Sequence, residues 1–183
     1  MRFKSGSKSG LLWVITVVIT LLVVVLAGCA KTEDSKVTRE QADNQVIVAA
    51  TRVAATGLGE ALKNVTGESQ RVDFVRQFIN PIRFMDDDSG YFFVYDYNCK
   101  NITIGVFSDL VGQDLTNLKD TKGKYFIQDF VEVAKKGGGF SEYYWYHTLT
   151  KVEMRKISYI MPIPGTAYLI GSGYYPDVPV VKQ

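Results

Sequence analysis

The sequence contains few of the residues that build catalytic and metal sites. It has one histidine and two cysteines among 183 residues. This composition excludes a metal site with several histidine ligands and leaves little acid–base machinery of that kind. A phosphate-binding loop, a nucleophile elbow and a Cys-x-x-Cys pair are also absent from the sequence. We therefore expect neither an enzyme nor a bound cofactor.

The excess of basic over acidic charge is small as well. The net charge is +2, and three of the 21 basic residues lie within residues 1–28, which contain no acidic residue. The rest of the chain is close to neutral, so no basic surface for nucleic acid is expected. Residues 11–28 form the long uncharged run of the chain. A basic start followed by such a run is typical of a secretory signal, although its length also borders on that of a membrane-spanning helix.

The uncharged run ends in Leu-Ala-Gly-Cys, residues 26–29. This ending resembles the lipobox of prokaryotic lipoproteins. The resemblance implies that residues 1–28 are a lipoprotein signal peptide and that Cys29 carries a lipid anchor on the extracytoplasmic side of a membrane. The alternative is a retained membrane helix. Both interpretations place the following residues outside the cytoplasm, because the basic residues precede the run.

The remaining chain divides into a short polar tether, residues 29–38, and one domain, residues 39–183. If Cys29 is lipidated, Cys99 has no partner for a disulfide, so the domain must be held together by packing. Apolar residues at intervals of three and four predict helices over residues 37–65, 68–82 and 125–136. Aromatic and β-branched segments predict strands at residues 91–97, 102–107, 140–149, 152–163 and 167–175. The order predicts an α+β fold with a long N-terminal helix on an antiparallel sheet.

Strand alternation predicts which side chains share a face. Tyr91, Phe93 and Tyr95 lie on one face of their strand, and Tyr143, Trp145 and His147 lie together on another. Lys156 lies in a strand of mainly apolar and aromatic residues. An ammonium group in a partly apolar pocket would be suited to anchoring a carboxylate, whereas a lysine on the outer face would simply be solvated.

Two further features have open interpretations. Asp86–Asp88 fit either a cation site or a solvated turn before a strand, and the solvated turn is favoured. His147 fits either a ligand contact or an ordinary polar residue at a strand end, and the latter is favoured.

Five motifs occur in a characteristic order: DDDSGYFFVYD, LVGQDLTNLKDTKGK, GGGFSEYYW, RKISYIMPIPG and YLIGSGYYPD. Together they resemble the single Cache domain, an extracytoplasmic sensor module related to PAS folds, over roughly residues 40–178. The resemblance implies a curved antiparallel sheet around a small-molecule pocket, and a short organic acid such as acetate, propionate, pyruvate or lactate as the ligand. It also implies a set of ligand-binding residues: Arg83, Tyr91, Phe93, Tyr95, Tyr143, Trp145 and Lys156.

The resemblance leaves some points open. Arg83 would either neutralise the ligand or fasten the helix to the sheet. Gly105 and Val106 stand where many relatives have a His-Pro pair, which puts an acetate-like specificity in doubt. No transmitter follows the domain in this sequence, so a separate membrane receptor or transporter is the expected partner. The alternative is a Cache-fold interaction lipoprotein that binds no ligand.

Overall fold

The computed structural model describes residues 38–177, and the expected signal peptide, the lipid anchor at Cys29 and residues 29–37 of the tether lie outside this range. The described residues form three helices, one short 3₁₀ helix and five strands. The helices are α2 (Arg39–Leu62), α3 (Glu68–Ile79) and α4 (Phe126–Lys135), and the 3₁₀ helix is η1 (Ser108–Leu110). The strands are β1 (Phe92–Asp96), β2 (Asn101–Ile104), β3 (Gly139–Tyr146), β4 (Glu153–Pro162) and β5 (Tyr168–Tyr174).

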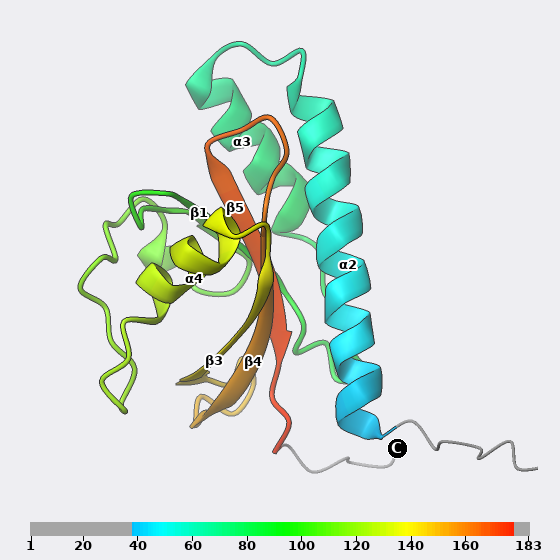
Figure 1. The fold of residues 1–183 in the computed structure, drawn as a ribbon, viewed down its shortest axis with the longest axis vertical. Helices are drawn as coiled ribbons and strands as arrows, with labels where there is room; N and C mark the ends of the chain where they lie inside the picture. The colour runs from blue at the N-terminus through cyan, green and yellow to red at the C-terminus, as the bar shows by residue number, and fades with distance from the viewer. Residues whose placement is uncertain (1–37, 178–183) are drawn as a thin grey trace, which may run out of the picture. The chain divides into compact units, whose positions relative to one another are not determined.

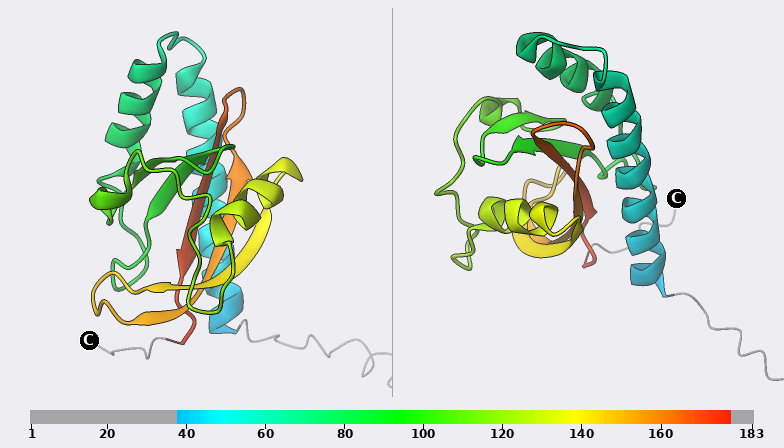
Figure 2. Two further views of the ribbon diagram at one scale, coloured as in Figure 1. Left: turned by 90° about the vertical axis from the view of Figure 1, so that its left-hand side faces the viewer. Right: turned by 45° about the horizontal axis from the view of Figure 1, so that its top comes forward.

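The five strands form one sheet in the order β2-β1-β5-β4-β3, and each neighbouring pair is antiparallel. The helices α2 and α3 cover one face of this sheet, and α4 lies against the other (Figure 1). Figure 2 shows how the sheet curves around α4 and the loop that precedes it. This arrangement confirms the α+β fold, with a long N-terminal helix packed on a curved antiparallel sheet.

Helix α2 begins where the sequence provides a cap. Thr38 accepts a hydrogen bond from the backbone N–H of Gln41 at 3.2 Å, and the Gln41 side chain accepts from the Thr38 N–H at 2.8 Å. This reciprocal capping satisfies two backbone donors that the first turn would otherwise leave unpaired. Within α2, a Cβ atom added at Gly59 would come within 2.8 Å of the Pro164 carbonyl oxygen. Glycine therefore lets α2 approach the β4–β5 turn closely, although it is a poor helix former.

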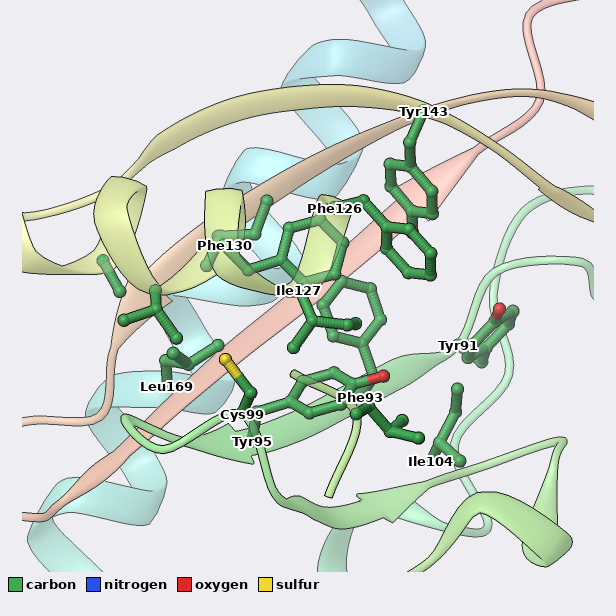
Figure 3. Close-up of a cluster of buried hydrophobic side chains, with 14 residues drawn as sticks. Tyr91, Phe93, Tyr95, Cys99, Ile104, Phe126, Ile127, Phe130, Tyr143 and Leu169 are labelled. Carbon is green, nitrogen blue, oxygen red and sulfur yellow. The ribbon is translucent and has the colours of Figure 1, made fainter. Parts of the chain in front are cut away.

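The two faces of the sheet bury different sets of side chains. Phe92, Val94 and Ile170 face α2 and α3. Phe93 and Leu169 belong to the cluster that faces α4, shown in Figure 3. The alternation predicted from the sequence is thus confirmed for β1, and β5 alternates in the same way. The cluster on the α4 side contains most of the residues expected to bind ligand.

Strand β5 is also fastened to α2 through polar contacts. The hydroxyl oxygens of Thr51 and Ser172 lie 2.7 Å apart, and both residues are fully buried. Tyr174 reaches Asn44 with a 3.2 Å hydrogen bond. Alternate residues of β5 therefore face α2 on one side and the aromatic cluster on the other, so this strand lies between the long helix and the candidate site.

Candidate functional site

The candidate site is built on the concave face of the sheet, where aromatic rings from β1, β3 and α4 meet (Figure 3). Phe126 stacks on Tyr143, with ring centroids 4.7 Å apart and planes inclined by only 4°. Phe130 stacks on Phe93 at 5.1 Å. Stacked and edge-on pairs of this kind hold the rings in defined positions beyond the effect of burial alone. The α4 side of the sheet is therefore a rigid aromatic wall.

Lys156 projects into this wall from the middle of β4. It is fully buried, so the alternative of a solvated lysine on the outer face is wrong. Its Nζ lies 3.9 Å from the ring centroid of Tyr91, 5.0 Å from that of Tyr175 and 5.9 Å from that of Phe93. Among residues 38–177 it has neither a hydrogen-bond partner nor an ion-pair partner.

Burial lowers the pKa of Lys156 well below its ordinary value. The cause is desolvation, because a charged amine surrounded by apolar rings loses its hydration and gains no anion in return. The rings supply some attraction for a cation, but a ring face replaces hydration only in part. A carboxylate placed against Nζ would supply the missing counter-charge and restore the pKa.

The strands around the amine also carry hydroxyl groups. The hydroxyl oxygens of Tyr143 and Ser158 lie 3.1 Å apart. Burial raises the pKa of Tyr91 and of Tyr143 well above the ordinary value; the Ser158 contact opposes this for Tyr143, and nearby tyrosines raise the pKa of both. These phenols therefore remain protonated and can act as hydrogen-bond donors. We call Lys156, Tyr91, Phe93, Tyr143, Ser158 and Tyr175 the amine site.

Two glycines on β5 create the space for the amine site. A Cβ atom at Gly173 would lie 2.2 Å from the Ser158 hydroxyl oxygen and 3.0 Å from Cε of Lys156. A Cβ atom at Gly171 would lie 2.4 Å from the ring of Phe93. The sequence Ile-Gly-Ser-Gly thus leaves the inner face of β5 bare, and the side chains from β1 and β4 fill that space.

Arg83 has a different place. Its guanidinium donates hydrogen bonds to the carbonyl oxygens of Asn80 at 2.9 Å, of Ile82 at 2.7 Å, and of Gly105. These bonds join the end of α3 to the chain after β2, which favours the fastening role over ligand contact. A Cβ atom at residue 105 would lie 2.9 Å from Nη1 of Arg83. Gly105, which stands where the family resemblance implied a His-Pro pair, therefore leaves room for the Arg83 guanidinium.

The other residues expected to bind ligand lie at different distances from the amine of Lys156. The ring of Tyr91 lies 3.9 Å from the amine and that of Phe93 5.9 Å, while Tyr143 belongs to the same aromatic cluster and pairs with Ser158. Tyr95 packs against Phe130, with ring centroids 6.2 Å apart. Trp145 is partly buried against Phe126, at 5.2 Å. Tyr95 and Trp145 therefore extend the aromatic wall beyond the amine.

Sequence reasoning missed two members of the site. Tyr175 follows the last residue of β5 and falls on the same face as Gly171 and Gly173, so continuing the alternation by one residue would have identified it. Ser158 lies two residues from Lys156, so alternation puts both on one face, but its pairing with Tyr143 depends on how β3 and β4 align. Within residues 38–177 no cluster of three or more potential metal ligands is present.

Comparison with models of protein families matches residues 38–178 to the Cache domain. This match covers most of the chain, so the chain belongs to the Cache domain family, as its sequence motifs indicated. It is a sensor domain of the class that serves as the ligand-binding part of chemoreceptors and sensor histidine kinases. Domains of this class are extracytoplasmic. No helix among residues 38–177 has the length and apolar character needed to cross a membrane.

Two relatives illustrate this class. The chain is 34% identical over 88 residues to the sensor histidine kinase MctS of Rhizobium johnstonii, which covers 48% of this chain and 19% of that protein. It is 28% identical over 179 residues to the methyl-accepting chemotaxis protein McpP of Pseudomonas putida, which covers 95% of this chain and 32% of that protein. The chain therefore spans a third or less of the length of these relatives.

Solved structures share the fold. A periplasmic sensor domain of a chemotaxis protein superposes with a TM-score of 0.67 at 27% identity, covering 76% of this chain and 100% of that one. A Cache chemosensory domain whose structure concerns carboxylic acid recognition superposes with a TM-score of 0.66 at 23% identity, covering 76% of this chain and 99% of that one. These likenesses agree with the α+β architecture described above.

Proposed function

We propose that this Cache domain binds a small organic anion, most simply a short carboxylic acid, with its carboxylate against Lys156. The observation that carries this proposal is the fully buried amine without a protein partner. A buried charge is stable only when it is paired or hydrogen-bonded. The phenols of Tyr91 and Tyr143 can in addition donate hydrogen bonds to a carboxylate. Recognition of carboxylic acids by one structural neighbour is consistent with this chemistry, although at 23% identity that likeness shows only the fold.

The proposed contact set is smaller than the set expected from the sequence. Lys156 is the charge anchor, Tyr91 and Tyr143 are donors, and Phe93 and Trp145 provide apolar contacts for a short carbon chain. Tyr95 supports the wall, and Arg83 is assigned a structural role because its donors already reach three carbonyl groups. One cation among phenols suits a ligand with a single negative charge.

The proposal extends to the setting of the domain. We infer that Cys29 carries a lipid anchor and that a separate membrane receptor or transporter receives the ligand or the ligand-dependent conformation. The sequence at residues 26–29 and the kinship with chemoreceptors and sensor kinases support this inference. Replacing Cys29 by serine should abolish incorporation of labelled fatty acid into the expressed protein, whereas Cys99→Ser should not. Labelling that persists in the Cys29 variant would contradict the anchor.

Thermal unfolding tests the binding proposal. The full-length chain, purified in a mild detergent, is heated with a panel of two- to four-carbon acids and with amino acids. A ligand present at about 100 times its dissociation constant stabilises the folded state by about 2.7 kcal/mol, or roughly 5 to 10 °C for a chain of this size. We expect such a shift with at least one acid, and its loss in Lys156→Met. A folded protein that responds to no acid would contradict the proposal.

A second candidate function is that of an interaction protein, and one surface feature favours it. An open apolar groove of about 330 Å³ lies between α2 and α3, lined by Ala49, Ala50, Val53, Ala54, Phe78, Ile82 and Phe92. Val53 is 74% exposed. Apolar surface of this kind often marks a docking site. A null result in the acid panel would move the assignment to this candidate.

A further inference from the structure

His147, the single histidine, follows the last residue of β3 and is 2% exposed. Its Nδ1 faces the backbone N–H groups of Leu149 and Thr150, each at 3.4 Å. Two N–H donors directed at one ring nitrogen require that nitrogen to carry a lone pair, so the proton resides on Nε2. Burial lowers the pKa of His147, and the charges of Lys156 and Lys151 lower it further, against an opposing effect of Asp87. The ring is therefore neutral with a fixed tautomer.

The Nε2–H group points towards the loop that precedes β1. It has no hydrogen-bond partner, and its nearest acid is Asp87, whose Oδ2 lies 3.8 Å away. Asp87 is held in place by its other oxygen, because Oδ1 accepts a hydrogen bond from the Ser89 N–H at 3.1 Å. Oδ2 is thereby left facing the histidine. A movement of about 1 Å would convert this contact into a hydrogen bond to a charged acceptor.

The other side of His147 contacts the amine site. Its ring packs on Tyr175 with centroids 4.7 Å apart and planes at 63°. The Tyr175 hydroxyl donates to the Tyr146 carbonyl oxygen at 2.7 Å, and the Tyr175 ring lies 5.0 Å from Nζ of Lys156. Tyr175 lies beyond the end of β5, so the strand ladder does not fix its side chain. Its position depends on the hydroxyl contact, on the histidine and on Tyr91, whose phenol also interacts with that of Tyr175.

We propose that Asp87 and His147 are positioning residues for anion binding, acting through Tyr175 on the environment of Lys156. Asp87 fixes His147, His147 fixes the Tyr175 ring, and that ring forms one wall around the amine. The inference rests on the proposed function, because it concerns the affinity of the same site. It also assigns a role to one residue of the Asp86–Asp88 turn that its two neighbours do not share.

The test compares three variants that remove the same charge from the same turn: Asp87→Asn, Asp86→Asn and Asp88→Asn. In Asp87→Asn, the amide can still accept from Ser89, but its NH₂ group then faces the Nε2–H of His147. We expect Asp87→Asn to weaken binding of the most stabilising acid of the panel by about 3- to 10-fold, less than the loss of a formed hydrogen bond to a charged group, because Oδ2 and Nε2 lie 3.8 Å apart. Asp86→Asn and Asp88→Asn should change the affinity by less than about twofold, because they lack this contact.

Nitrogen NMR of the histidine ring provides a readout that does not depend on ligand. We expect a neutral ring protonated at Nε2, and a shift of the Nε2–H signal in Asp87→Asn but not in Asp86→Asn. A ring protonated at Nδ1, or equal effects of the three variants on this signal, would overturn the positioning role. If the wild-type chain binds none of the acids while the Nε2–H signal responds as expected, the proposed function fails and the Asp87–His147 contact stands. An affinity in Asp87→Asn equal to that of the wild type would overturn the inference while leaving the proposed function intact.

Discussion

Replacing Lys156 by methionine should stabilise the protein and abolish its response to organic anions. The amine is fully buried and unpaired among the described residues, and its contacts are with the rings of Tyr91, Phe93 and Tyr175. Methionine is similarly long, carries no charge and packs well on aromatic rings. The substitution therefore removes the cost of burying an amine without opening a large cavity.

The size of the effect follows from two opposing contributions. Replacing buried ion pairs by apolar side chains of similar volume often stabilises proteins by about 1–4 kcal/mol, and an amine without a partner has no ion-pair attraction to lose. The attraction between the ammonium and the surrounding rings, worth roughly 0.5–2 kcal/mol, is lost at the same time. We therefore expect the free energy of unfolding to rise by about 1–2 kcal/mol, which corresponds to roughly 2 to 8 °C in melting temperature.

The assay is thermal and denaturant unfolding of the full-length chain at about pH 7, with and without the best acid of the panel. Lys100→Met provides the matched control, because Lys100 is exposed and its loss should change stability by no more than about 0.5 kcal/mol. A melting temperature of Lys156→Met below that of the wild type would refute the reasoning. That result would mean that the amine is stabilised by contacts within the protein.

The same variant should alter the pH dependence of stability. Burial lowers the pKa of Lys156 in the folded chain below the ordinary value of 10.5 that it regains on unfolding. Between these two values the unfolded chain binds more protons, so the free energy of unfolding rises with pH. The advantage of Lys156→Met should therefore shrink as the pH is raised from about 7 to about 9. An advantage that is constant over this range would contradict a lowered pKa.

Two further substitutions separate the amine site from its support. Gly173→Ala should weaken acid binding and lower the free energy of unfolding by about 1–3 kcal/mol, because the new methyl group collides with Ser158 and Lys156. The control is Gly57→Ala, on an open helix surface, which should raise the free energy of unfolding by up to about 1 kcal/mol. Denaturant unfolding and calorimetric titration provide the measurements, and unchanged binding in Gly173→Ala would contradict the packing account. Arg83→Gln should lower the free energy of unfolding by about 1.5–3 kcal/mol while changing acid affinity less than about twofold, because its hydrogen bonds go to backbone carbonyls. If Arg83→Gln remains folded but loses much more than twofold in acid affinity, Arg83 is a ligand contact.

The sequence predicts which side chains share a face of the sheet, because alternation along a strand is a local property. Tyr91, Phe93 and Tyr95 fall together in the cluster that faces α4, and Tyr143 and Trp145 join them. Lys156 and Ile160 are four residues apart on β4, so alternation puts both on the inner face, where Ile160 belongs to the same cluster. The family resemblance added the expectation of a small-molecule pocket, and the match over residues 38–178 confirms the family.

The contacts that complete the site could not be predicted from alternation along the strands. Gly173 lies opposite Ser158 because of the alignment of β4 with β5, and the sequence does not state that alignment. The sequence did not distinguish two roles for Arg83, ligand contact and fastening of the helix to the sheet, since both place a guanidinium near the start of the sheet. His147 looked like an ordinary residue at a strand end. Its buried Nε2–H group and its contact with Tyr175 depend on segments far apart along the chain.

A crystal structure of the chain with the most stabilising acid of the panel tests the central claim most directly. The account predicts a carboxylate oxygen within about 2.7–3.2 Å of Nζ of Lys156, with the carbon chain against Phe93. It also predicts at least one hydrogen bond from the hydroxyl of Tyr91 or Tyr143. An acid bound elsewhere, for example in the groove between α2 and α3, with Lys156 still unpaired, would contradict the assignment of the amine site.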